Sequence, residues 1–72
     1  MSPRTEKQFE EIRENKRALI IETALTLFAE KGYYATSIQA ITKSAGISKG
    51  LLYNYFESKE ALLKDIVLDG FN

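Results

Sequence analysis

The sequence predicts an all-α fold, a single small domain in which a long first helix precedes a helix-turn-helix and the start of a fourth helix. Three observations predict it. Apolar residues recur at helical spacing, a glycine divides the two short central segments, and 44% of the 72 residues are hydrophobic, which argues against disorder. A domain of this length buries only about 60% of its unfolded surface. We therefore expect marginal stability unless more chain or a partner contributes.

The chain opens with residues 1–11, which are polar and of mixed charge. We expect a flexible tail that becomes helical between Phe9 and Arg13. The first helix then covers residues 12–31 and ends at Gly32. Its apolar stripe follows one helix face and comprises Ile21, Ala24, Leu25 and Phe28, widened by Ala18 and Leu27.

The second helix lies at the start of residues 35–59. Thr36 or Ser37 is its candidate N-cap, because a hydroxyl there accepts backbone N–H groups that a helix start leaves unpaired. The helix stops at Gly46, since glycine adopts the left-handed conformation without a Cβ penalty. Its apolar positions are Ile38, Ile41 and Ala45.

The third helix is expected from Lys49 to about Phe56, with Ser48 as its cap. Leu52 and Phe56 lie four residues apart on one face, so we assign them to the core. One residue alone separates Ser48 from Gly46, which makes the connection short and sharply bent. Helix, glycine turn and helix is the arrangement that lays its second helix in the major groove of DNA.

A fourth helix follows a turn and is capped by Ser58, with Glu60 favourable beside its positive end. Its apolar stripe is Leu62, Leu63, Ile66, Val67 and Phe71. This stripe is broad, and Leu68 and Phe71 have no evident partner in the sequence. We therefore expect the chain to be the first domain of a longer protein.

The net charge is zero, but the charges are segregated along the chain. Residues 31–59 carry a local +3, whereas residues 18–30 and 60–72 together carry −4. One basic face on a neutral body suits moderate binding to phosphates with limited non-specific affinity. Lysines that are merely scattered over a solvated surface are the alternative interpretation.

The composition argues against several other functions. The sequence contains neither cysteine nor histidine, which removes thiolate nucleophiles, the usual zinc ligands and the commonest general base. We therefore expect no enzyme, no metal site and no cofactor. No apolar run is long enough for a signal peptide or a membrane span, so we expect a soluble cytoplasmic protein with no membrane partner.

Several motifs in succession resemble one family. The string GYYATSIQAITKSAGISKGLLYNYFESKEALL, preceded by a helix that ends TLFAEKG, is similar to the N-terminal DNA-binding domain of the TetR family of bacterial transcriptional regulators. The resemblance runs from about Arg17 to Ile66 without a gap. It implies a homeodomain-like three-helix core, with residues 12–72 as the DNA-binding domain.

The resemblance also implies partners. It points to a homodimeric repressor whose two recognition helices enter successive major grooves of a palindromic operator in double-stranded DNA. It further implies a C-terminal helical domain, absent from this chain, that dimerises and binds a small-molecule inducer.

The resemblance places DNA contacts on Ser37, Gln39, Ser48, Lys49, Gly50, Leu51, Tyr53, Tyr55 and Lys59. At the start of the second helix, the implied role of Ser37 is to hold a phosphate. Gln39 is a candidate to pair with adenine, although ordinary helix surface is an equally good interpretation of it. Tyr53, Tyr55 and Lys59 match positions of phosphate-binding side chains.

Residues 48–51 form the first turn of the recognition helix, the part that meets bases. Ser48 is a cap whether or not it also contacts a phosphate. Lys49 is expected to donate to guanine or to a phosphate, and Gly50 lets the backbone approach closely. Leu51 departs from the small polar residue usual in the family and is expected to contact a base through apolar surface, such as a thymine methyl.

A second departure is Thr42, which stands where alanine is common and whose hydroxyl is expected to bond a carbonyl of the preceding turn.

Tyr53 and Tyr55 point about 200° apart on a helix, so at least one of them is expected to be exposed. A different function remains open, that of a small protein-interaction module. In that case Leu51, Tyr53 and Tyr55 dock into a partner groove.

Overall fold

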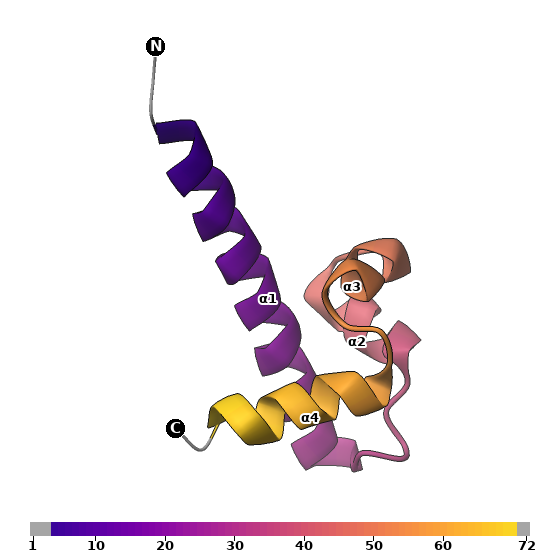
Figure 1. Cartoon of the computed structure of the whole chain (residues 1–72). Coiled ribbons are helices and arrows are strands. Elements are labelled where there is room, and N and C mark those ends of the chain that lie inside the picture. Colours follow the sequence, from indigo (N-terminus) through magenta and orange to yellow (C-terminus); the bar gives the residue numbers. More distant parts are fainter. Residues whose placement is uncertain (1–3, 71–72) are drawn as a thin grey trace.

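The computed structural model describes the backbone of residues 4–70 and the side chains of residues 12–68. This described part is helical and contains no strand, which confirms the all-α prediction. Its helices are α1 (Arg4–Lys31), α2 (Ile38–Ala45), α3 (Lys49–Tyr55) and α4 (Lys59–Gly70) (Figure 1).

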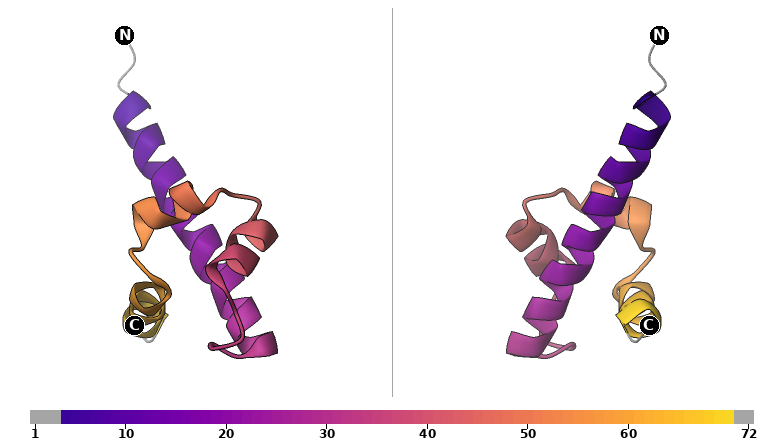
Figure 2. Two further views of the ribbon diagram at one scale, coloured as in Figure 1. Left: turned by 90° about the vertical axis from the view of Figure 1, so that its right-hand side faces the viewer. Right: turned by 90° about the vertical axis from the view of Figure 1, so that its left-hand side faces the viewer.

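The long helix α1 is the axis of the domain. Helices α2 and α3 lie on one side of it, and α4 crosses it toward its C-terminal end (Figure 1). The perpendicular views in Figure 2 show α3 crossing the middle of α1, with α2 and α4 on opposite sides. Helix α3 therefore leads the chain from the α2 side of α1 to the α4 side.

Helix α1 begins at Arg4, so the predicted start between Phe9 and Arg13 was wrong. Residues 5–11 contain no glycine or proline and are rich in Glu, Lys and Gln, which are strong helix formers. A polar, charged composition is typical both of a flexible tail and of a solvent-exposed helix. Polarity alone therefore did not distinguish a tail from a helix. The N-terminal part of α1 extends beyond the other helices (Figure 1).

The buried face of α1 is centred on Ile20 and Ala24, which are both fully buried. The predicted stripe is confirmed in part, since Ala24 is buried and Ile21, Leu27 and Phe28 pack against the core. Two of its members lie off this face, since Leu25 is 51% exposed and Ala18 is exposed as well. Apolar residues occupy most positions between 18 and 28, and each step along a helix turns by about 100°. Periodicity alone therefore left the centre of the band undetermined, and packing against α2 and α4 fixes it.

Hydroxyl caps set the start of α2. Ser37 is the N-cap, and its Oγ accepts the backbone N–H of Ala40 at 3.0 Å. The alternative candidate, Thr36, is fully buried instead. Its Oγ1 donates to the carbonyl of Gly32 at 2.8 Å and to that of Leu27 at 3.3 Å, so Thr36 ties the loop back onto the end of α1.

The turn between α2 and α3 has the predicted form. Gly46 adopts φ 74° and ψ 33°, the left-handed conformation that favours glycine. Ser48 caps α3 by accepting the N–H of Leu51 at 3.0 Å. Thr42, buried on α2, donates its hydroxyl to the carbonyl of Gln39 at 3.0 Å, as its position predicted.

Helix α4 begins as predicted, with Ser58 Oγ accepting the N–H of Ala61 at 3.1 Å. Two members of its predicted stripe, Leu62 and Ile66, are buried in the core. Leu63 is half-buried, whereas Val67 is 46% exposed. The remaining member, Phe71, lies outside the described residues.

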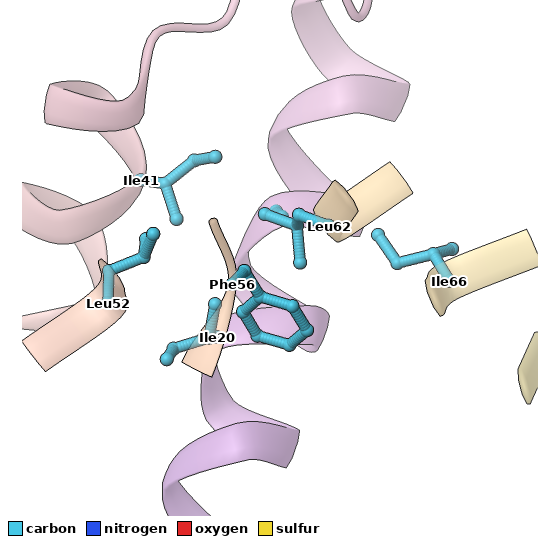
Figure 3. Close-up of a cluster of buried hydrophobic side chains, with 7 residues drawn as sticks. Ile20, Ile41, Leu52, Phe56, Leu62 and Ile66 are labelled. Atoms are coloured by element: carbon cyan, nitrogen blue, oxygen red, sulfur yellow. The ribbon is translucent and has the colours of Figure 1, made fainter. Parts of the chain in front are cut away.

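All four helices contribute to one hydrophobic core, shown in Figure 3. Leu52 and Phe56, assigned to the core from their spacing, are 0% and 2% exposed. Replacing such a buried leucine by alanine costs about 2–5 kcal/mol. The buried cluster consists of Ile20, Ala24, Ile41, Leu52, Phe56, Leu62 and Ile66.

An ion pair joins α1 to α4 at the edge of the core. Arg17 Nη2 lies 3.3 Å from Asp65 Oδ2, and the Arg17 guanidinium lies 5.7 Å from the centre of the Phe56 ring. Both charged side chains are more than a third exposed, so the pair itself contributes little to stability. Its effect is to hold the arginine in one place.

Candidate nucleic-acid interface

The first turn of α2 presents polar side chains to solvent. Ser37 and Gln39 are both exposed. Since the hydroxyl of Ser37 accepts the N–H of Ala40, its own proton stays available to an acceptor outside the chain. The amide of Gln39 is free to pair with a base edge.

The first turn of α3 is the second exposed segment. Ser48, Lys49 and Gly50 are all exposed, and Leu51 is half-buried. A Cβ built on Gly50 would meet only the Oγ of Ser48, at 3.9 Å. Packing within the described chain therefore does not require glycine there, and the missing side chain leaves room for another molecule to approach the backbone.

One of the two tyrosines of α3 is exposed, which confirms the prediction that at least one would be. Tyr53 is 47% exposed, and its side chain is available to an outside partner. Tyr55 is half-buried and packs against the core, with its ring centre 6.4 Å from that of Phe56. The structure thus separates a solvent-facing tyrosine from one that faces α1.

Lys59 is tied to the loop between α1 and α2. Its Nζ donates to the carbonyl of Tyr33 at 2.9 Å and to that of Thr36 at 3.0 Å. The same ammonium lies 4.3 Å from the centre of the Tyr33 ring. We call these three contacts the Lys59 bridge. An ammonium has three donors, so two are used inside the domain and one is left.

The loop that the bridge holds contains two dissimilar tyrosines. Tyr33 packs edge-on against Phe28 with ring centres 5.1 Å apart, and its buried hydroxyl has no hydrogen-bond partner among the described residues. Burial raises the pKa of the Tyr33 phenol, and nearby Glu60 and Tyr34 act in the same direction. Tyr34, by contrast, is 93% exposed. The first tyrosine is packing, as aromatic residues past a helix end usually are.

The lysines of the basic stretch are not equivalent. Lys31, Lys43 and Lys49 are exposed, whereas Lys59 is partly buried in its bridge. Lys49 is the exposed lysine that lies on the first turn of α3. The charge available to a phosphate at that turn comes from this residue.

A cleft between α1 and α3 was not predicted from the sequence. It has a volume of about 310 Å³ and is lined by Arg13, Glu14, Arg17 and Tyr55. The first three belong to α1, outside the helix-turn-helix. Arg13 and Arg17 are four residues apart and therefore lie on one face of α1, which the sequence alone predicts. That α3 packs beside this face depends on tertiary contacts, which the sequence pattern does not show.

Comparison with known proteins decides the family. The profile of the family described as bacterial regulatory proteins, tetR family, matches residues 20–66. The chain belongs to the TetR family. The matched segment contains α2, α3 and the parts of α1 and α4 that enclose the core.

Named relatives agree with this assignment. The chain is 67% identical over 48 residues to YuxN of Bacillus subtilis, an uncharacterised HTH-type transcriptional regulator, covering 67% of this chain and 16% of that protein. It is 56% identical over 48 residues to YerO of the same organism, covering 67% and 17%. Against the HTH-type transcriptional repressor KstR2 of Rhodococcus jostii, identity is 45% over 56 residues, covering 78% and 27%.

The chain thus spans about a sixth of the length of YuxN and YerO. No solved structure matches it. TetR-family regulators bind DNA and control transcription, and they are not enzymes. The matched residues are therefore the DNA-binding helix-turn-helix domain of this family.

The described residues contain neither a membrane-spanning helix nor a group of metal-ligating side chains. None of their helices has the length and apolarity needed to cross a bilayer. Nor do residues 12–68 bring together three or more acidic, histidine or cysteine side chains that could hold a metal ion.

Proposed function

We propose that this domain binds a specific sequence in double-stranded DNA by inserting α3 into the major groove, with the first turn of α2 on the adjoining backbone. The observation that carries the proposal is the exposure of Ser48, Lys49 and Gly50 on the first turn of α3. Capping fixes this turn in place, so the side chains that meet DNA are held by a rigid core.

Individual roles follow from chemistry and position. Lys49 donates to guanine O6 or N7 or to a phosphate, and Gln39 pairs with adenine. Leu51 contacts a thymine methyl through apolar surface, while Gly50 permits close approach of the backbone. These contacts with base edges would let the domain distinguish one DNA sequence from another.

The remaining predicted contacts position the domain on the duplex. Ser37, Ser48, Tyr53 and Tyr55 donate hydroxyl protons to phosphates. Lys59 offers a phosphate the one donor that its bridge does not use. Contacts of this kind strengthen binding to every sequence equally.

We further propose that the protein acts in the bacterial cytoplasm as a homodimeric repressor. Two copies of α3 then read a palindromic operator, with half-sites about one helical turn apart. Release follows when a small-molecule inducer binds a C-terminal domain, which also dimerises the protein. The repressor KstR2 and the short share of each relative covered by this chain support this part.

The affinity for duplex DNA measured over a series of salt concentrations tests the proposal. Because neutralised phosphates release counterions, log K is expected to fall with log salt at about −0.9 per phosphate contact. The alternative, a protein-interaction module, requires the exposed α3 face to dock into a protein groove. A purified protein with no measurable affinity for duplexes at low salt would contradict DNA binding and leave that module as the explanation.

A further inference from the structure

The cleft between α1 and α3 extends beyond the helix-turn-helix. Among the described residues that line it, Tyr55 lies on α3, while Arg13, Glu14 and Arg17 lie on α1. Its volume of about 310 Å³ is at the lower end of the roughly 300–1,000 Å³ of ligand pockets. It is open to solvent, so it suits one phosphate group of a passing strand better than an enclosed small molecule.

Arg13 is a cation of this cleft that forms no ion pair with another described residue. Its side chain is exposed, and it has no hydrogen-bond partner among the described residues. Arg17, by contrast, forms an ion pair with Asp65. Arginine keeps its charge at every relevant pH, and its planar fork of donors matches the oxygens of a phosphate.

Arg17 has a different part in the same cleft. Its guanidinium is fixed by Asp65 at 3.3 Å and by the ring of Phe56 at 5.7 Å. Asp65 offsets part of the charge of Arg17, so we assign the phosphate first to Arg13. The half-buried position of Tyr55 likewise restricts where its hydroxyl can lie.

We propose that this cleft binds a phosphate of the DNA backbone, with the guanidinium of Arg13 as its principal ligand and the hydroxyl of Tyr55 as a second donor. The inference rests on the proposed function, because Tyr55 lies on α3, the helix that we propose to enter the major groove. Since Tyr55 and Arg13 line the same cleft, a strand that contacts the side chain of Tyr55 also lies close to Arg13. The DNA footprint therefore continues from the helix-turn-helix onto α1.

Glu14 opposes this role and gives the proposal an unusual signature. Its carboxylate lines the same cleft and repels a phosphate there. Removing this one negative charge is therefore expected to tighten DNA binding, while removing the charge of Arg13 weakens it. Opposite effects at adjacent residues are hard to obtain from a general loss of folding.

The test is the affinity for a random-sequence duplex, measured over a salt series. The purified proteins are the wild type, Arg13→Ala, Arg13→Lys, Glu14→Gln and a control, Lys64→Ala, which removes an exposed positive charge from α4. Arg13→Ala is expected to reduce the steepness of the log–log slope by about 0.9 and to weaken binding about eightfold near 0.1 M salt. Arg13→Lys keeps the slope, Glu14→Gln binds more tightly, and Lys64→Ala resembles the wild type.

Two results overturn the phosphate site while DNA binding stands. One is a wild type that binds duplexes alongside an Arg13→Ala variant whose slope matches that of Lys64→Ala. The other is a Glu14→Gln variant with unchanged or weaker affinity. A wild type that binds no duplex at all overturns the proposed function, and the phosphate site with it.

Discussion

Helices α3 and α4 each begin with a lysine that follows a serine cap, and the two lysines have different surroundings. Both serines are caps, with Ser48 Oγ 3.0 Å from the nitrogen of Leu51 and Ser58 Oγ 3.1 Å from that of Ala61. The lysines diverge. Lys49 is exposed, whereas Lys59 donates to two carbonyls and lies over the ring of Tyr33.

The difference shows how tertiary contacts give identical local sequences different surroundings. A cation in the first turn of a helix is locally unfavourable, because that end carries the positive pole of the macrodipole. In α4 this cost is offset by the Lys59 bridge and by Glu60 in the same turn. The first turn of α3 contains no acid, so Lys49 lacks a compensating charge there, which is what a lysine that contacts DNA requires.

The largest expected effect is a loss of stability, and we expect it for Lys59→Ala but not for Lys49→Ala. Lys59→Ala removes two charge-assisted hydrogen bonds and a cation–ring contact, which should lower the free energy of unfolding by about 2–3 kcal/mol. Lys49→Ala, its matched control, should stay within about 0.5 kcal/mol of the wild type. Thermal unfolding measures both, at about 4–8 °C per kcal/mol for a domain of this size. Equal midpoints for the two variants would show that the bridge adds nothing net.

The second expected effect is on base preference, and here Lys49→Ala is the variant that should change it. Lys49→Ala should change discrimination between operator variants by about 1–3 kcal/mol if the lysine pairs bidentately with guanine. Lys59→Ala should instead weaken binding to all duplexes and reduce the salt slope by about 0.9, because its remaining donor meets a phosphate. Competition between duplexes that differ at single base pairs measures the first effect. An unchanged salt slope for Lys59→Ala assigns that lysine to the fold alone.

The smallest expected effect concerns the serines, which should behave alike in stability. Ser48→Ala and Ser58→Ala each remove one capping hydrogen bond and should cost about 1 kcal/mol of stability. DNA affinity separates them, since only Ser48 is expected to contact the duplex. Urea unfolding and duplex titration of the two variants check this, and equal losses of affinity would argue that Ser48 is no more than a cap.

Local chemistry made much of this domain predictable. The caps at Ser37, Ser48 and Ser58 and the left-handed Gly46 each depend on residues within a few positions of them. The hydroxyl bond of Thr42 to the carbonyl of Gln39 spans only three residues, and it too was expected. Spacing by four likewise placed Leu52 and Phe56 in the core.

What was missed depends on contacts distant in sequence. The Lys59 bridge joins residues 23 and 26 positions apart, and the Arg17–Asp65 pair spans 48. No pattern within one helix encodes such pairings. The centre of the buried face of α1 was missed for a related reason, because its apolar band is wide and packing buries Ile20 and leaves Leu25 exposed. The cleft at Arg13 depends on how α3 crosses α1.

Selection of bound duplexes from a random pool, carried out with the wild type and with Lys49→Ala, tests the central claim most directly. The wild type is expected to enrich one defined sequence, and Lys49→Ala to enrich a consensus altered at one or more base pairs. An identical consensus for both proteins, or no enrichment by the wild type, would contradict sequence recognition by the first turn of α3.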